Sequence, residues 1–298
     1  MKTNRITAIM LALVSIVSCQ HKELCYSHPH NGSLKVVFDW SEAQAPEGEN
    51  MELFLFSVGG GHPLHYQFYN MTGGTINVPS GSYHAICVNM GTGANRLANE
   101  LDSYEVFAIT TRADGNAGQI ILEPDILYSD HTREAFNINE MTQQTLVMYP
   151  EQRTPRYTVI VRNIHNLNWA RCCQASLSGL SCGYMVAKGT PSDAIHSQTF
   201  EMSRADETTL QGGITIFGHN HSECRDHILT LQFTLQDGME FTFTADVTTR
   251  MEQLAREGSM SGQIIVDLPV CLPKPISNGS GFQPTVDEWN GEEIELSL

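Results

Sequence analysis

The chain has 298 residues, with 33 acidic and 17 basic side chains and a formal charge of −16 at pH 7. A protein this acidic lacks the basic surface that nucleic-acid binding requires, so nucleic acid is excluded as a partner. The chain is long enough to bury a sizeable core without disulfides, and no spacing among its eight cysteines fixes a pairing. We therefore expect at least one free thiol.

Residues 1–18 have the pattern of a signal peptide. A basic start is followed by an apolar run from Ile6 to Val17, which is too short to cross a membrane as a permanent helix. The run stops at Cys19, and the letters IVSC resemble a lipobox, in which the cysteine takes a diacylglyceryl group and becomes the new N-terminus. We predict lipidation of Cys19 and a polar tether over residues 19–33, which would hold the chain to a membrane. The alternative is an ordinary secretory peptide that is cut near Ser18, with Cys19 as an incidental thiol.

Residues 34–153 contain short runs rich in Val, Ile, Phe and Tyr, separated by turn residues. LKVVFDW at 34–40 alternates like a strand with one apolar face, whereas MELFLFS at 51–57 alternates less cleanly and suits a strand buried on both sides. GTINVP and SGSYHAICVN flank the turn residues 79–81, which predicts a hairpin. This half is expected to be one β-sandwich.

A second series of β-runs occupies residues 154–298, after the polar interruption EQRTP. Its strongest hairpin is LQFTLQDGMEFTFTAD, because Asp237-Gly238 supplies the positive φ that a tight turn requires. VTTRMEQLARE at 247–257 is the one helical pattern, and EEIELSL at 292–298 is the final predicted strand. Strands at regular spacing in two successive sets predict two β-sandwich domains with a boundary near residue 153.

The histidines raise the question of a metal site. His219, His221, Cys224 and His227 have nitrogen and sulfur donors at spacings that one loop could wrap around zinc. Structural zinc sites usually draw ligand pairs from two separated knuckles, so we interpret this stretch as a solvated loop. The HPH motif at 28–30 is interpreted in the same way, as exposed or hydrogen-bonded. No metal and no cofactor are expected.

Motifs for catalysis are absent from the sequence, which has no G-x-S-x-G and no H-E-x-x-H. GLSCG resembles a nucleophile elbow, but its surroundings favour Ser181 and Cys182 as loop or core residues. VGGGH at 58–62 follows a β-pattern with no helix behind it and reads as a hairpin loop. Cys172 and Cys173 are expected to point to opposite faces of one strand. We expect no enzyme, and a hydrolase is an unsupported third hypothesis.

At family level, several segments together carry a resemblance. These segments are HKELCYSHPH directly after the lipobox, then VVFDW, MELFLFS, GGTINVPSGSYHAICVN and the closing GFQPTVDEWNGEEIELSL. Through them, the chain resembles Bacteroides-type lipoproteins that are grouped as a domain of unknown function and allied to the fimbrillin superfamily. The resemblance spans nearly the whole mature chain, and its opening decapeptide is the most specific part.

This resemblance implies two tandem transthyretin-like β-sandwiches, attachment to the outer membrane on either face, and a role as a fimbrial tip, anchor or accessory adhesin. The implied partners are the membrane, fimbrillin-like subunits, and ligands on host or bacterial surfaces. A glycan-binding surface lipoprotein is the alternative, for which exposed Trp or Tyr platforms would be needed. The tryptophans are Trp40, Trp169 and Trp289.

The N-terminal region also lacks the basic cleavage site that is typical of polymerising subunits in the fimbrillin superfamily. In those proteins a protease cuts after a basic residue, commonly arginine, and removes the first strand so that another subunit can replace it. No arginine occurs between Cys19 and Asn95, where the lysines are Lys22 and Lys35, and Lys35 lies inside a predicted strand. We therefore expect the first strand to stay attached.

Overall fold

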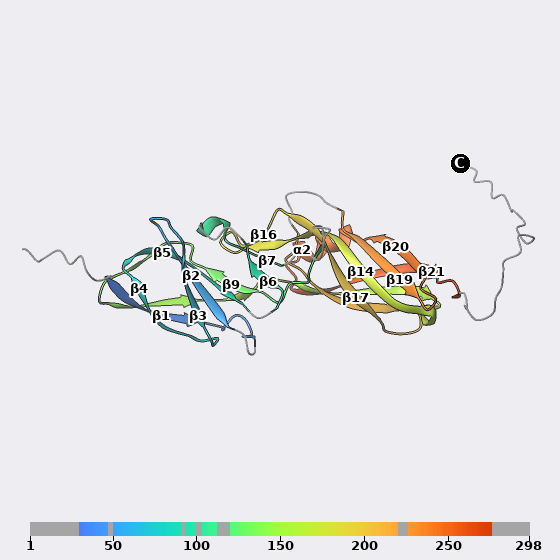
Figure 1. Ribbon diagram of the computed structural model, residues 1–298, viewed down its shortest axis with the longest axis horizontal. Helices are drawn as coiled ribbons and strands as arrows, with labels where there is room; N and C mark the ends of the chain where they lie inside the picture. The colour runs from blue at the N-terminus through green and yellow to red at the C-terminus, as the bar shows by residue number, and fades with distance from the viewer. Residues whose placement is uncertain are drawn as a thin grey trace, which may run out of the picture.

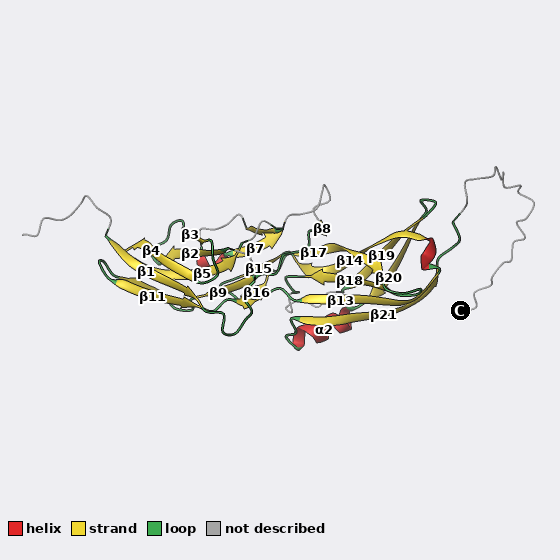
Figure 2. Ribbon diagram, turned by 90° about the horizontal axis from the view of Figure 1, so that it is seen from below, coloured by secondary structure: helices red, strands yellow, loops and turns green. Residues whose placement is uncertain are grey.

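The computed structural model describes residues 30–46, 50–90, 93–98, 103–111, 120–219 and 226–275. These residues form an elongated molecule that consists mainly of strands, with the N-terminal strands at one end and the C-terminal strands at the other (Figures 1 and 2). The prediction of an all-β chain with two tandem β-sandwiches is confirmed. No helix in the described residues is long and apolar enough to span a membrane.

Two packed sheets form the N-terminal sandwich. Their strands are β1 (Asn31–Phe38), β2 (Met51–Ser57), β3 (Leu64–Phe68), β4 (Gly73–Pro79), β5 (Gly81–Asn89), β9 (Tyr128–His131), β10 (Phe136–Ile138), β11 (Gln143–Met148) and β12 (Glu151–Gln152). One sheet has the order β11-β1-β4, and the other has the order β12-β9-β5-β2-β3 with β10 also paired to β5.

Strand β1 is paired along both of its edges. It runs parallel to β11 over six residue pairs and antiparallel to β4 over seven. Its alternation places Leu34, Val36 and Phe38 in the core between the two sheets, where each is at most 3% exposed. The predicted one-sided strand is therefore present, and it is the central strand of its sheet.

Strand β2 is buried on both faces, as its sequence predicted. Leu53 and Leu55 face the core shared with β1, whereas Phe54 and Phe56 face a second apolar cluster on the opposite side of the sheet. Because both faces of β2 are apolar, a third layer has to cover the outer one.

Both halves of the chain contribute to this third layer. It is a small sheet with the order β16-β15-β7-β6, made from β6 (Asn95–Leu97), β7 (Ala108–Thr111), β15 (Gly183–Met185) and β16 (Thr190–Pro191), next to the short 3-10 helix η1 (Tyr104–Val106). Phe107 from the first half and Tyr184 and Phe217 from the second are buried in the cluster under it. The second half of the chain thus covers part of the first.

The C-terminal sandwich has longer strands. They are β13 (Arg156–His165), β14 (Ala170–Ser181), β17 (Ile195–Arg204), β18 (Leu210–Thr215), β19 (Ile228–Leu235), β20 (Glu240–Asp246) and β21 (Ser261–Cys271), with the 3-10 helix η3 (Leu167–Trp169) and the helix α2 (Thr248–Arg256). The order is β20-β19-β14-β17-β18-β13-β21, and β8 (Ile120–Ile121) from the first half also pairs with β17.

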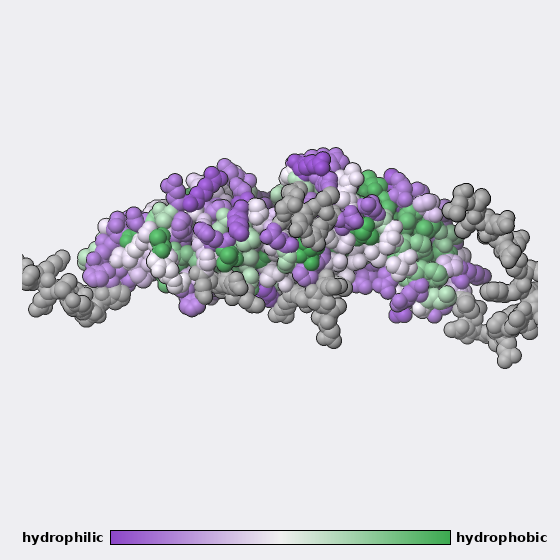
Figure 3. All heavy atoms as spheres, turned by 90° about the horizontal axis from the view of Figure 1, so that it is seen from above, coloured by the Kyte–Doolittle hydropathy of each residue, from purple (hydrophilic) through white to green (hydrophobic). Residues whose placement is uncertain are grey.

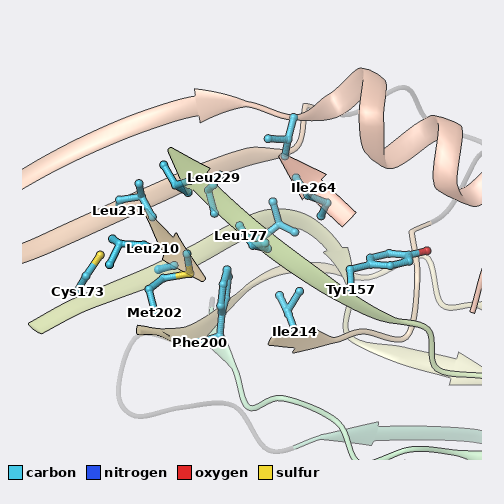
Figure 4. Packing of buried hydrophobic residues seen from close by; sticks show 14 of the residues in the cluster. Tyr157, Cys173, Leu177, Phe200, Met202, Leu210, Ile214, Leu229, Leu231 and Ile264 are labelled. Carbon is cyan, nitrogen blue, oxygen red and sulfur yellow. The ribbon is translucent and has the colours of Figure 1, made fainter. Parts of the chain in front are cut away.

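The core of this sandwich confirms the predicted alternation. Tyr157, Val159 and Val161 of β13 point inward and are at most 4% exposed, and they pack among leucines, isoleucines and Phe200 (Figure 4). The β19–β20 hairpin turns at Gly238, whose φ is 87°, as the Asp-Gly pair predicted. The predicted helix is present as α2.

One predicted hairpin is wrong. β4 and β5 do not pair with each other: β4 pairs with β1 in one sheet and β5 pairs with β2 in the other. Pro79 to Gly81 therefore form a corner that carries the chain between sheets, and the backbone N–H of Ser80 donates to the carbonyl of His30. Pro and Gly suit such a corner as well as a hairpin turn, so the local sequence did not distinguish them.

The domain boundary near residue 153 stays a prediction. Residues 153–155 do connect the last strand of the first half to β13, but β7 pairs with β15 and β8 pairs with β17 across this point. The final predicted strand, 292–298, lies outside the described residues, as do the predicted signal peptide and most of the predicted tether.

Candidate functional site

The chain enters the folded part of the molecule at the start of β1. The backbone N–H of Met141 donates to the carbonyl of Asn31, and the His30 ring lies within hydrogen-bond distance of the Glu140 carboxylate. Gly32 is packed so closely that a Cβ there would lie 2.4 Å from the carbonyl oxygen of Asn139. The β10–β11 turn therefore fixes the point where the predicted tether begins. Cys19 lies outside the described residues, so its lipidation stays a prediction.

Lys35 lies in the middle of β1, and its side chain is exposed. Its backbone is opposite Thr145 of β11 on one side and Thr75 of β4 on the other. A protease needs an extended, accessible backbone around the bond that it cuts, so this position is protected by two ladders of hydrogen bonds. The prediction that Lys35 is hard to reach agrees with its place in the sheet.

Of the candidate zinc ligands, the structure describes two. The rings of His219 and His227 lie 4.7 Å apart in an edge-to-face arrangement, and His227 Nδ1 lies 3.0 Å from the carbonyl oxygen of Ser178. Burial lowers the pKa of His227, because the protonated ring would lose its hydration. His221 and Cys224 lie outside the described residues, so the absence of a metal site stays a prediction.

Elsewhere in the described chain no three His, Cys, Asp or Glu side chains gather as a metal site would require. His30 is about half exposed and paired with Glu140, in line with the interpretation of this motif as exposed or hydrogen-bonded. His28 of the same motif lies outside the described residues. The described residues therefore give no set of side chains on which a metal ion could be placed.

A groove of about 400 Å³ lies where the two halves meet. It is lined by Gln152, Arg153, Pro155, Tyr157, Tyr184, Gly189, Thr190, Pro191, Phe217, Gly218, His219, Leu254, Ala255, Gly258, Ser259 and Met260. Clefts between domains are common places for ligands, and this one combines apolar walls with a few polar groups.

The polar groups in this groove are held by the protein itself. Arg153 donates to the carbonyl of Ser129 and pairs with Glu151 at 2.7 Å, and the hydroxyl of Tyr157 donates to the carbonyl of Ser259 at 3.3 Å. Burial raises the pKa of Tyr157 and of Tyr184, so both stay protonated at neutral pH. The groove can hold a small polar or aromatic ligand.

The residues of GLSCG are part of the sandwich, as expected for loop or core positions. Ser181 is the last residue of β14 and is 1% exposed, and Cys182 Sγ lies 3.5 Å from the hydroxyl of Ser192. Nothing in these contacts supplies a general base. VGGGH forms the β2–β3 hairpin loop, as predicted, with Gly60 and Gly61 at positive φ.

The chain can be compared with known proteins on this basis. Residues 18–201 match a family described as a domain of unknown function, DUF5119. The chain belongs to this family. A relative from Bacteroides ovatus, described as "Putative fimbrium anchoring subunit Fim4B", is 24% identical over 97% of each chain.

Solved structures of other proteins show a similar fold. A putative adhesin from Bacteroides ovatus covers 84% of this chain and 94% of its own, with a TM-score of 0.66 and 20% identity. Putative polysaccharide binding proteins (DUF1812) from Bacteroides thetaiotaomicron cover 79% and 89%, with a TM-score of 0.51 and 12% identity. The expected relationship to fimbrial and adhesin-like proteins is confirmed.

Cysteines are distributed over both halves of this DUF5119 chain. Those in the described residues, Cys87, Cys172, Cys173, Cys182 and Cys271, form no disulfide with one another, which agrees with the expected free thiols. Cys172 is exposed and Cys173 is buried, as strand alternation predicted, and burial raises the pKa of Cys173 to about 12. A thiol with this pKa is inert at neutral pH.

The small sheet at the junction was not predicted. Its strands are two to four residues long, too short to show a period, and β15 pairs with β7, a strand more than 70 residues earlier in the chain. The signal that could have found it is the double-sided apolar pattern of β2, which requires a cover. The groove follows from the same packing, since Tyr184 and Phe217 belong both to that cluster and to the groove.

Proposed function

We propose that this chain is a non-enzymatic, lipid-anchored protein of the cell envelope that anchors a fimbrium or serves as an accessory adhesin. The proposal is supported by the Bacteroides ovatus relative, whose name describes a fimbrium anchoring subunit and which aligns from end to end with this chain. The outer membrane, on either face, is the proposed location. Fimbrial subunits are the proposed partners.

The observation that carries the proposal is the position of β1. Its side chains Leu34, Val36 and Phe38 form part of the N-terminal core, and its backbone holds β4 and β11 together. Loss of β1 would leave two strands unpaired along their inner edges and would open the core to water. Since no arginine occurs between Cys19 and Arg96, the strand is retained, and such a subunit terminates an assembly instead of extending it.

The proposed lipid on Cys19 would keep the sandwich close to the membrane. Eleven residues separate Cys19 from Asn31, and at full extension they reach no more than about 40 Å. The tether leads into β1, which pairs with both β4 and β11. Attachment and folding of the N-terminal sandwich therefore depend on the same segment.

Membrane attachment is tested by replacing the lipidated residue. In cell fractionation, Cys19→Ala should move the protein from the membrane to the soluble envelope fraction, with Cys25→Ala as the matched control that stays in the membrane. Metabolic labelling with an alkyne fatty acid should mark the native chain and the control but not Cys19→Ala. Unchanged membrane partition of Cys19→Ala would refute the lipid anchor.

Retention of β1 is tested on protein purified from its native membrane. Mass spectrometry should give a mature form that begins at Cys19 with its acyl chains. Cross-linking of the same material should join it to fimbrial subunits at one end of the fibre. A mature form that begins between residues 36 and 60, in ladders that resist mild denaturation, would contradict the terminating role.

Glycan binding is the second candidate, because the junction groove offers aromatic and polar side chains together. Trp40 does not act as a platform, since it is half-buried and its ring N–H donates to the carbonyl of Met71 at 2.6 Å. A glycan array distinguishes the two roles. A specific hit that is lost in the groove variant Gln152→Ala/Thr190→Ala would favour glycan binding over the anchoring proposal.

A further inference from the structure

The C-terminal sandwich is open along one side. Its two sheets are joined where β17 meets β18, so the opposite side is bounded by β20 on one sheet and β21 on the other. Among the described residues, β20 pairs only with β19, and β21 pairs only with β13. Two strand edges therefore lie on the same side of one core, each with unpaired backbone groups.

The inward-facing side chains at this opening are apolar and only partly buried. On β20, Phe243 is opposite Leu231 and Phe241 is opposite Phe233, and both of these β19 partners are at most 1% exposed. Residues directly opposite across two strands share a face, so the two phenylalanines point toward the core. Both are only partly buried, although Phe243 packs edge-to-face on Phe233 with ring centroids 5.8 Å apart.

The inward-facing side chains of β21 are also only partly buried after the start of the strand. Ile264 is 1% exposed, but the next inward-facing residues, Val266, Leu268 and Val270, are only partly buried. In Figure 3, the most extensive hydrophobic area of the surface in view lies on the C-terminal half. We call the opening formed by Phe241, Phe243, Val266, Leu268 and Val270 the distal seam.

Helix α2 explains why the other end of the opening is closed. It connects β20 to β21, and its side chains Met251 and Leu254 are at most 1% exposed in the core. Leu254 packs so close to the start of β21 that a Cβ on Gly262 would lie 2.4 Å from its methyl group. The chain thus covers the proximal end of the seam with a helix. The distal end requires another cover, because a partly exposed apolar row of this length is costly in water.

The sequence after β21 has the properties of such a cover. β21 ends at Cys271, at the distal end, and the chain continues to Leu298. The last seven residues are EEIELSL, in which Ile294, Leu296 and Leu298 alternate with polar residues. Three alternating apolar residues match the period and the length of Val266, Leu268 and Val270.

The connection is also long enough. Sixteen residues lie between Pro275 and Glu292, and at full extension they reach about 50 Å. The distal seam runs from Val266 to Val270 and is about 13 Å long. A strand that turns back at the distal end would run antiparallel to β21, the simplest connection between neighbouring strands.

We propose that residues 292–298 fill the distal seam of their own chain as an additional strand along the free edge of β21. Ile294, Leu296 and Leu298 would pack on the partly buried side chains of β20 and β21, and Glu293 and Glu295 would face water. The strand would satisfy the free backbone groups of β21 and remove an edge that otherwise promotes association between molecules. This proposal does not depend on the fimbrial role.

Hydrogen–deuterium exchange of the soluble chain starting after Cys19 tests the proposal. Amides of 293–298 and of the outer edge of β21 should be protected, and Ile294→Asp/Leu296→Asp should raise their exchange rates at least about tenfold. Glu293→Gln/Glu295→Gln is the matched control on the opposite face of the same strand and should leave exchange unchanged. Peptides from the N-terminal sandwich should exchange alike in all three proteins, which shows that each is folded.

The remaining outcomes separate the occupants of the seam. Protection that is independent of protein concentration, in a chain that is monomeric by light scattering, supports docking within one molecule. Protection that appears only as concentration rises, together with dimers, overturns the proposal in favour of a second copy. Unprotected amides in 293–298 at every concentration, with β21 exchange the same in wild type and in Ile294→Asp/Leu296→Asp, overturn docking of the tail altogether.

Discussion

The two sandwiches share one arrangement of strands but differ in what covers them. In each half the first strand is central: β1 lies between β11 and β4, and β13 lies between β21 and β18, parallel to the former and antiparallel to the latter in both cases. In the N-terminal half the outer face of the second sheet is covered by a third layer. In the C-terminal half the side between β20 and β21 is open. The same connectivity therefore leaves different surfaces to be covered.

The sequence of one strand in each half explains this difference. In β2, the outward-facing Phe54 and Phe56 alternate with the inward-facing Leu53 and Leu55, so both of its faces are apolar. β19, ILTLQFTL, alternates from Leu229 onward, and Thr230, Gln232 and Thr234 lie on its outer face. The number of layers in each half follows from whether the outer face of this strand, β2 or β19, is apolar or polar.

The largest expected effect comes from the third layer. Phe107 is fully buried and packs on Phe54 and Phe56, with ring centroids 4.9 and 5.7 Å away. Phe107→Ala should lower the free energy of unfolding by about 3–5 kcal/mol. Because this layer contains strands from both halves, calorimetry should show one transition that shifts as a whole. Phe233→Ala in the C-terminal core is the control of equal size, and two separate transitions, of which each variant shifts one, would show that the halves unfold independently.

A glycine at the start of β4 gives the next largest effect. Gly73 has φ of 94°, and a Cβ there would lie 2.2 Å from the carbonyl oxygen of Val36. Gly73→Ala should cost about 3 kcal/mol, because a strained φ is combined with a backbone clash on β1. Gly238→Ala, in the β19–β20 turn, has a similar φ but no atom within 4 Å of its Cβ, and it should cost only about 1 kcal/mol. If urea unfolding gave the same loss of unfolding free energy for Gly73→Ala and Gly238→Ala, the close approach of β4 to β1 would be contradicted.

A buried histidine should make stability depend on pH. Burial lowers the pKa of His227 in the folded protein below its ordinary value of 6.5, so the unfolded chain binds more protons just below that pH. The stabilisation is complete above pH 6.5 and is lost as the pH falls from 6.5 through the folded pKa. Neighbouring Glu252 and Asp246 oppose this shift but do not cancel it.

Thermal unfolding at pH 7.5 and 5.0 measures this dependence. His227→Asn should reduce the loss of Tm between the two values, since one proton-linked group is removed. His131→Asn tests the N-terminal half in the same way, because burial also lowers the pKa of His131. The same loss of Tm in wild type and in the double variant would contradict both assignments.

An exposed ion pair should give the smallest effect. Arg162 of β13 donates to both carboxylate oxygens of Asp267 of β21, at 3.0 and 2.9 Å, and both side chains are about half exposed. Asp267→Asn should cost about 0.5 kcal/mol, since water and salt screen such pairs. Salt at 0.5 M should reduce the difference further. A loss above about 2 kcal/mol would mean that this pair fixes β21 in place.

Much of the fold could be predicted from local patterns, because strand alternation and turn chemistry are local. The burial of Tyr157, Val159 and Val161, the Gly238 turn and helix α2 all followed from the sequence. The corner at Pro79 to Gly81 was mistaken for a hairpin, because turn residues do not reveal which strands they separate. The junction layer depends on pairing between β7 and β15, which lie far apart in the chain, and no local pattern reports such a contact.

The central position of β1 has a mechanical consequence. A pull on a lipid at Cys19 would reach the folded chain at residue 30 and act along the axis of β1. Hydrogen bonds between strands lie across that axis, so the pull would load the ladders to β11 and β4 together in shear and could not break them one at a time. A pull at right angles to β1 would instead peel its bonds apart in sequence. A chain held at this point would therefore resist a pull along β1 far better than a sideways force.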